Sequence, residues 1–392
     1  PYKQLFSIAY VYIIPLIATL LCDIRHIRTE NVVATLQVLN KGVFRVGRYL
    51  RKSVHFGYVH CVKPVLFRFH PDNVHAKTVA FGKQVAQNRA MLALTKKSLA
   101  YQHPMLEQSL HGIQLLNPVG LSAGFDKSVE LVPLTEAIGF GFITTGSVTG
   151  KPCEGNAKPW FHRLPEEKSL VVNVGLANQG SVTVAKRLQS DERTAARKVP
   201  LMISVARTND QSSSTDEQAI DDYCTGLRNL KEYPELFEIN ISCPNTFGGE
   251  PFTDPLRLDK LLSAIDELHL TQPVFVKMPS NKPWEELEAL LAVTAQHSIQ
   301  GVTVCNLRKD RSGVAVDASA KGNLSGKPVQ ELSDELIEKT YRAYGEHLTI
   351  IGVGGIFTAE DAYRKIKRGA SMVALITGMI YEGPSIVGQI NE

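Results

Sequence analysis

Two side-chain amides and one thiol lie within six consecutive residues, in the order Asn240-Ile241-Ser242-Cys243-Pro244-Asn245. Two amides can hold a planar ligand by its carbonyl and N–H edges. The thiol, once deprotonated, can remove a proton from that ligand or attack it. Most cysteines are inert and buried, but the position of Cys243 between two asparagines favours a catalytic role. As a base it requires a site that lowers the thiol pKa below its usual value near 8.5.

These groups come directly after the apolar run 236–241, which predicts a buried strand. Pro244 has no backbone N–H and therefore ends that strand. Seven similar runs occur between residues 113 and 392, separated by helical patterns. The eight predicted strands are Pro118–Ser122, Phe140–Thr145, Pro200–Val205, Phe237–Ile241, Val274–Lys277, Gly301–Val304, Thr349–Gly352 and Met372–Ile376. This alternation predicts a parallel (β/α)8 TIM barrel, whose ligands bind at the C-terminal ends of the strands.

Small and polar residues follow most of these strands. Lys277 ends a buried apolar run, where an unpaired charge is costly, so a functional cation is favoured over a structural ion pair. The glycine turns at Gly354-Gly355 and Thr377-Gly378 follow the last two strands, where such barrels commonly bind a phosphate. The spacing of a dinucleotide-binding motif is absent from the sequence around Gly352. A dinucleotide such as FAD or NAD is therefore disfavoured as the ligand of this phosphate site.

Taken together, these motifs resemble the dihydroorotate dehydrogenase family over residues 58–390. The resemblance implies FMN-dependent oxidation of dihydroorotate to orotate, with Cys243 as the catalytic base and a quinone as the electron acceptor. The base is usually Ser in the quinone-linked membrane branch and Cys in the soluble branch. The implied substrate-binding residues are Lys127, Asn173, Asn240, Asn245 and Asn306. The implied cofactor-binding residues are Ala123, Gly124, Lys127, Ser147, Ser204, Asn240, Lys277, Cys305, Ser325, Gly326, Gly354, Gly355, Ile376 and Thr377.

Three positions depart from the pattern of that family. Val172 and Ser204 stand where the family usually has Asn, and Leu307 stands where it usually has a hydroxyl. Asn173 can replace the first of these only if its loop is shifted by one residue. Each change removes a polar contact with the substrate. A related flavin oxidoreductase acting on another dihydropyrimidine or cyclic amide therefore stays open, as does a non-catalytic flavin-binding membrane protein.

The N-terminal part carries an uncharged run of 18 residues, Leu5–Cys22. This length fits a membrane anchor, and a removed signal segment or a buried helix are the alternatives. Residues 58–112 resemble the helical domain that lines a quinone tunnel, although an amphipathic helix pair packed on the barrel has the same pattern. The predicted division is 1–57 for anchor and linker, 58–112 for this domain and 113–392 for the barrel. Basic residues follow the anchor and favour the matrix or cytoplasmic side: Arg25, Arg28, Lys41, Arg45, Arg48, Arg51 and Lys52.

The composition narrows the class of protein and its compartment. A net charge of +4 over 392 residues argues against a nucleic-acid partner. The six cysteines form no CxxC pair and no zinc or cluster spacing, which predicts reduced thiols and no metal site. A lipid bilayer is an expected partner of the chain. The expected location is the mitochondrial inner membrane in a eukaryote, and otherwise the bacterial inner membrane.

Overall fold

The computed structural model describes residues 47–392. The chain divides into two units, Pro1–Tyr49 and Leu50–Glu392, and the second contains all the labelled elements below. The predicted anchor Leu5–Cys22 lies outside the described residues.

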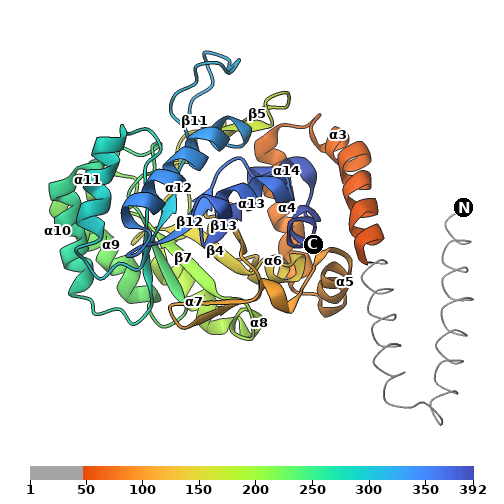
Figure 1. The fold of residues 1–392 in the computed structure, drawn as a ribbon, viewed down its shortest axis with the longest axis horizontal. Coiled ribbons are helices and arrows are strands. Elements are labelled where there is room, and N and C mark those ends of the chain that lie inside the picture. The colour runs from red at the N-terminus through yellow and green to blue at the C-terminus, as the bar shows by residue number, and fades with distance from the viewer. Residues whose placement is uncertain (1–46) are drawn as a thin grey trace, which may run out of the picture. The chain divides into compact units, whose positions relative to one another are not determined.

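Eight parallel strands form a closed barrel in the order β10-β12-β13-β3-β4-β7-β8-β9 (Figure 1). The predicted TIM barrel is therefore confirmed, and every predicted strand matches an observed one to within three residues at each end. The strands are β3 (Val119–Leu121), β4 (Phe142–Val148), β7 (Leu201–Val205), β8 (Leu236–Asn240), β9 (Val274–Lys277), β10 (Gly301–Val304), β12 (Thr349–Val353) and β13 (Met372–Leu375).

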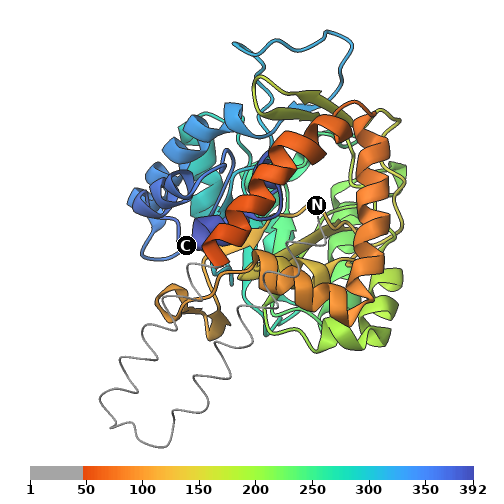
Figure 2. The same ribbon diagram turned by 90° about the vertical axis from the view of Figure 1, so that its right-hand side faces the viewer.

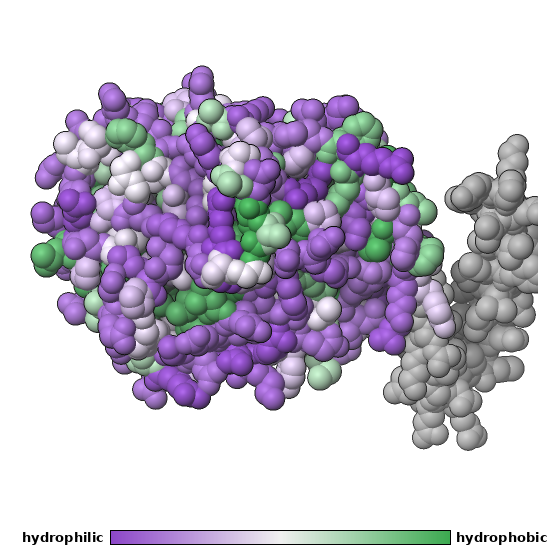
Figure 3. All heavy atoms as spheres, turned by 90° about the horizontal axis from the view of Figure 1, so that it is seen from above, coloured by the Kyte–Doolittle hydropathy of each residue, from purple (hydrophilic) through white to green (hydrophobic). Residues whose placement is uncertain are grey.

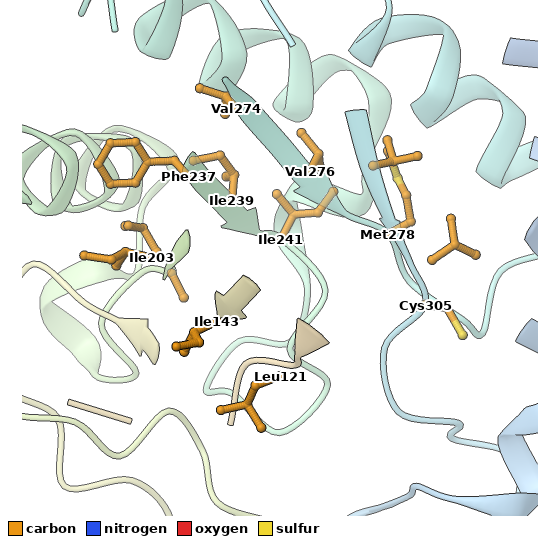
Figure 4. Packing of buried hydrophobic residues seen from close by; sticks show 14 of the residues in the cluster. Leu121, Ile143, Ile203, Phe237, Ile239, Ile241, Val274, Val276, Met278 and Cys305 are labelled. Atoms are coloured by element: carbon orange, nitrogen blue, oxygen red, sulfur yellow. The ribbon is translucent and has the colours of Figure 1, made fainter. Parts of the chain in front are cut away.

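Helices surround the barrel because each strand has an apolar outer face. Successive side chains of a strand point to opposite faces, so Phe237 and Ile239 of β8 lie on one side of it, next to Val274 and Val276 of β9 (Figure 4). The same buried cluster includes leucines of the surrounding helices. The helices are α6 (Val132–Ile138), α7 (Ser181–Ser190), α8 (Glu192–Ala195), α9 (Asp216–Leu230), α10 (Pro255–Asp266), α11 (Trp284–Thr294), α12 (Gln330–Tyr344), α13 (Ala359–Lys367), α14 (Thr377–Glu382) and α15 (Ile386–Asn391).

A second, smaller cluster fills the inside of the barrel. Phe142, Met202, Leu236 and Phe275 pack there with Leu115, which belongs to a hairpin ahead of the barrel. That hairpin consists of β1 (Gln108–Leu110) and β2 (Ile113–Leu115). Since Phe142, Leu236 and Phe275 lie at or next to the first residue of their strands, this cluster closes the N-terminal end of the barrel and leaves the other end for ligands.

The residues before the hairpin are mainly helical. In Figure 2 these helices, coloured red to orange, lie along one flank of the barrel, and α4 and α5 pack on α6. Residues 47–57 are helical and continue into η2 (Tyr58–Val62), α3 (Lys63–Leu66), α4 (Pro71–Ala86), α5 (Arg89–Leu99) and η3 (Pro104–Leu106). Within residues 47–392, no helix combines the length and the apolar character needed to span a bilayer.

A three-stranded antiparallel sheet joins these helices to the barrel. It contains β5 (Phe161–Leu164), β6 (Ser169–Val172) and β11 (Asn323–Leu324), with β6 in the middle. The buried Asp72 of α4 accepts hydrogen bonds from the backbone N–H groups of Trp160 (2.9 Å) and Phe161 (3.0 Å). Two charge-assisted bonds therefore fasten α4 to the start of β5.

Candidate active site

A large cavity lies at the C-terminal ends of the barrel strands. Its empty space, the open mouth included, is about 1280 Å³. β5 and β11 lie at the upper end of the molecule in Figure 1, and the view onto that end in Figure 3 has apolar residues gathered in the middle of a mainly polar surface. The cavity therefore opens at the end of the barrel where ligands of such folds bind.

The cavity brings together nearly all of the residues that the sequence predicts for the site. Because they come from every part of the barrel, the strands and not sequence proximity position them. The predicted residues in its lining are Ala123, Gly124, Lys127, Ser147, Asn240, Cys243, Asn245, Lys277, Cys305, Asn306, Ser325, Gly326, Gly354, Gly355, Ile376 and Thr377.

Two predicted residues do not line the cavity. Leu170 and Val172 of β6 face it, and the side chain of Asn173 instead accepts a hydrogen bond from Asn156 Nδ2 (3.0 Å). The one-residue shift that would bring Asn173 into the site is therefore not observed. The hydroxyl of Ser204 is fully buried behind the lining, 2.9 Å from Ser147 Oγ. Ser147 in turn accepts a hydrogen bond from Asn240 Nδ2 (2.8 Å), so Ser204 acts on the site through that chain.

One side of the cavity presents backbone donors. The N–H groups of Gly326, Gly354 and Gly355 donate to no acceptor in the described part of the chain. The hydroxyls of Ser325 and Thr377 lie 2.9 Å apart beside them. Unpaired N–H groups next to hydroxyls can surround a phosphate. We call Ser325, Gly326, Gly354, Gly355 and Thr377 the donor side of the cavity.

Another part of the lining carries amides that the protein already holds. Asn245 Nδ2 donates to the carbonyl of Val172 (3.0 Å), and Asn245 Oδ1 accepts from Asn323 Nδ2 (2.6 Å). Asn306 Nδ2 donates to the carbonyl of Ser242 (2.7 Å). These contacts orient the amides toward a common space. We call Asn240, Asn245 and Asn306 the amide side. The hydrogen bond from Asn323 to Asn245 was not predicted, because nothing near Asn323 in the sequence indicates a partner for Asn245.

Two lysines supply the positive charge of the lining. The side chain of Lys277 is almost fully buried, and its Nζ lies 3.7 Å from Glu238 Oε1. Lys127 Nζ lies 2.9 Å from His75 Nε2, and both residues line the cavity. Both lysines were predicted from the sequence, and neither of their partners was. A single Glu inside the apolar run 236–241 was the available signal for Glu238.

Burial controls the protonation of Lys127 and His75. Desolvation lowers the pKa of Lys127 to about 8, although the nearby Asp126 and Asp72 act against that shift. Desolvation, followed by the charges of Lys127 and Lys158, lowers the pKa of His75 to about 3. The imidazole is therefore neutral near pH 7 and can accept a hydrogen bond from the ammonium of Lys127.

The pKa of the Cys243 thiol differs from the sequence-based expectation. Burial raises its pKa to about 11, although the N–H of Asn245 and the charge of Lys277 favour the thiolate. The expectation of a lowered thiol pKa is therefore not met, because a low-polarity environment disfavours the anion more than its two partners favour it. Burial also raises the pKa of Cys305 to about 11.

Comparison with known proteins gives a consistent result. The family model described as dihydroorotate dehydrogenase matches residues 105–392. "Dihydroorotate dehydrogenase (quinone)" of Christiangramia forsetii is 32% identical over 340 residues, which cover 86% of this chain and 98% of the relative. The protein of the same name from Chloroflexus aurantiacus is 34% identical over 360 residues, covering 88% and 97%. The crystal structure of DHODH in complex with ferulenol from Eimeria tenella has a TM-score of 0.72 at 27% identity, covering 82% of this chain and 89% of that one.

Proposed function

The chain belongs to the dihydroorotate dehydrogenase family, and on this basis we propose that it oxidises dihydroorotate to orotate, with FMN as cofactor and a quinone as electron acceptor. The observation that carries the proposal is the arrangement of one cavity. Unpaired backbone donors line one part of it, and Cys243 stands among asparagines in another. The first arrangement suits a phosphate and the second a planar ring with carbonyl and N–H edges.

The residues of the donor side fit the phosphate of FMN. Gly355 has a φ of 70°, and a Cβ on it would lie 2.3 Å from Gln330 Cβ, so this turn requires glycine. The turn can therefore bring its N–H groups close to a ligand. Lys277 would lie near N1 and O2 of the isoalloxazine, where a cation favours the reduced ring. When bound, FMN supplies the acceptor for the hydride that leaves C6 of the substrate.

The residues of the amide side bind the substrate and move its proton. Asn240, Asn245 and Asn306 hold the edges of the pyrimidine, and Lys127 pairs with the carboxylate. The Cys243 thiolate takes the proton from C5, so an S–H bond forms as the C–H bond breaks. Because the thiol pKa is about 11, the thiolate is a minor form at neutral pH and a strong base when present.

The N-terminal helices are the proposed entry for the quinone and the contact with the bilayer. Apolar side chains stand exposed on them, as in surfaces that enter a membrane interface. His75 of α4 lines the cavity, so these helices reach the site itself. The proposed location is the inner membrane of mitochondria or bacteria. The exposed side chains are Phe56, Val62, Val65, Phe69, Phe81, Met91 and Leu94.

Anaerobic flavin bleaching tests the reaction directly. We expect the purified chain to be yellow and to lose its flavin absorbance within seconds of adding dihydroorotate. A colourless protein would overturn the FMN assignment. A yellow protein that dihydroorotate leaves unbleached would overturn the substrate and favour a non-catalytic role.

A second substrate class is favoured by two residues of the lining. Val172 and Leu307 both face the cavity and offer it no side-chain hydrogen bond. A dihydropyrimidine without a carboxylate, or another cyclic amide, needs fewer hydrogen bonds from this part of the lining. Dihydrouracil is the test compound: bleaching by dihydrouracil and not by dihydroorotate would favour this class.

Matched surface variants test the quinone and lipid contacts. Val65 of α3 and Val182 of α7 are equally exposed, each at 52%. Val65→Glu should weaken binding to lipid vesicles and slow reoxidation by a quinone embedded in them, while bleaching by dihydroorotate persists. Val182→Glu is the control and should change none of these. Equal behaviour of the two variants would contradict the assignment of the helices.

A further inference from the structure

Glu238 places a carboxylate inside the barrel. It lies on β8 between Leu236, which packs in the inner cluster, and Asn240, which lines the cavity, so all three face the interior. Its exposed fraction is 2%, and Met202, Phe275 and Ile351 belong to the apolar cluster inside the barrel. A buried carboxylate there is costly, and an apolar side chain would fill the space at lower cost.

The two carboxylate oxygens have different environments. Oε2 accepts a hydrogen bond from Thr303 Oγ1 (2.8 Å). Oε1 has no hydrogen-bond partner among the described residues and lies 3.7 Å from Lys277 Nζ. A buried ion pair of this kind rarely stabilises a fold more than apolar residues of the same volume. Fold stability therefore does not account for Glu238, and its effect on Lys277 is the remaining consequence.

The Glu238 carboxylate affects the cavity only through Lys277. Lys277 belongs to the lining and Glu238 does not. Within residues 47–392, Glu238 is the carboxylate found in an ion pair with Lys277, whereas the other lysine of the lining, Lys127, contacts the neutral His75. Glu238 therefore decides how much positive charge the floor of the cavity presents to a ligand.

We propose that Glu238 is a positioning residue that offsets the charge of Lys277 and thereby lowers the reduction potential of the bound flavin. The inference rests on the proposed function, since it places FMN above Lys277. Reduction adds negative charge to the flavin ring, which a nearby cation favours and a carboxylate behind that cation opposes. A lower potential makes the passage of electrons from the flavin to a quinone more favourable.

The test is the reduction potential of the flavin-loaded full chain, measured by equilibration with redox dyes. Glu238→Gln removes the charge and keeps the size of the side chain. We expect the preference for reduced over oxidised flavin to rise roughly tenfold, which is about 30 mV for a two-electron couple. Asp334→Asn is the matched control. Asp334 also forms a buried pair with a lysine, Lys365 (2.7 Å), but neither residue lines the cavity, so the potential should stay unchanged.

Each result decides the inference. An unchanged or lower potential in yellow Glu238→Gln protein would overturn it and leave the proposed function intact. A wild-type chain that binds no FMN would overturn both. If the Gln variant fails to fold or to hold flavin, Glu238→Asp decides, because it keeps the charge and withdraws it by one methylene from Lys277. A higher potential then supports the inference, and an unchanged one contradicts it.

Discussion

The donor side and the amide side of the cavity differ in how their hydrogen-bonding groups are used. On the donor side the N–H groups of Gly326, Gly354 and Gly355 have no partner in the described part of the chain. On the amide side Asn245 and Asn306 already bond to the protein through both ends of their amides. An amide can make up to four hydrogen bonds, so some capacity remains. A phosphate can therefore bind without rearrangement, whereas substrate affinity depends on the neighbours that hold the amides.

The largest expected effect separates chemistry from cofactor binding. Cys243→Ala removes the proposed base on the amide side and leaves the donor side intact. We expect bleaching by dihydroorotate to slow by about 10²–10⁴-fold, the usual contribution of a general base, while the protein stays yellow. Stopped-flow absorbance under anaerobic conditions measures the rate. Bleaching at the wild-type rate would remove Cys243 from the mechanism, and loss of colour would show that the two sides are not independent.

The next effect targets the donor side. In Gly355→Ala the new Cβ would meet Gln330, and the φ of 70° is unfavourable for alanine. Together the overpacking and the strain should cost about 2–4 kcal/mol, so FMN affinity should fall at least tenfold. Fluorescence titration of the apoprotein with FMN measures it. Gly313→Ala is the control, because Gly313 has a φ of 78° with no atom within 4 Å of the added Cβ. Similar losses in both variants would mean that backbone strain, not the cavity wall, is responsible.

The third prediction concerns the pH dependence of ligand binding at Lys127. Because burial lowers the pKa of Lys127 to about 8, its ammonium loses its charge as pH rises through that value. The affinity for a carboxylate ligand should be constant below pH 8 and fall by up to about tenfold per unit above it. Spectral titration of the oxidised protein with orotate tests this. Lys127→Gln should bind weakly and without the break, and a break that persists in this variant would assign it to another group.

The bleaching rate at saturating dihydroorotate should have the opposite pH dependence. The Cys243 pKa of about 11 means that the thiolate fraction grows with pH throughout the neutral range. The rate should therefore rise toward alkaline pH while affinity falls. A rate that is flat between pH 7 and 9 would contradict thiolate as the reacting form.

The smallest effect tests the orientation of the amides. Asn323→Ala removes the hydrogen bond that Asn245 Oδ1 accepts (2.6 Å). Such a bond contributes about 0.5–1.5 kcal/mol, so the KM for dihydroorotate should rise by two- to tenfold with FMN affinity unchanged. Asn229→Ala, which removes a bond to Ser181 away from the cavity, should change neither value. A loss of FMN instead of substrate affinity would reverse the assignment of the two sides.

The sequence allowed the barrel to be predicted because every strand is a short buried run with a helix pattern after it. Site residues at strand ends were also accessible, since a closed barrel brings those ends together. Contacts between distant segments were not. His75 enters the cavity from α4, and Asn323 reaches Asn245 from β11. The shift in the Cys243 pKa was equally out of reach, because desolvation depends on packing that no local pattern encodes.

The two hydrogen bonds that Asp72 accepts at the start of β5 connect α4 to the lining of the cavity. Asp72 holds the N–H of Phe161, Phe161 is the register partner of Val172 in β6, and Val172 faces the cavity. A displacement of α4 relative to the barrel would therefore move the backbone of β5 and, through its pairing with β6, the side chain of Val172.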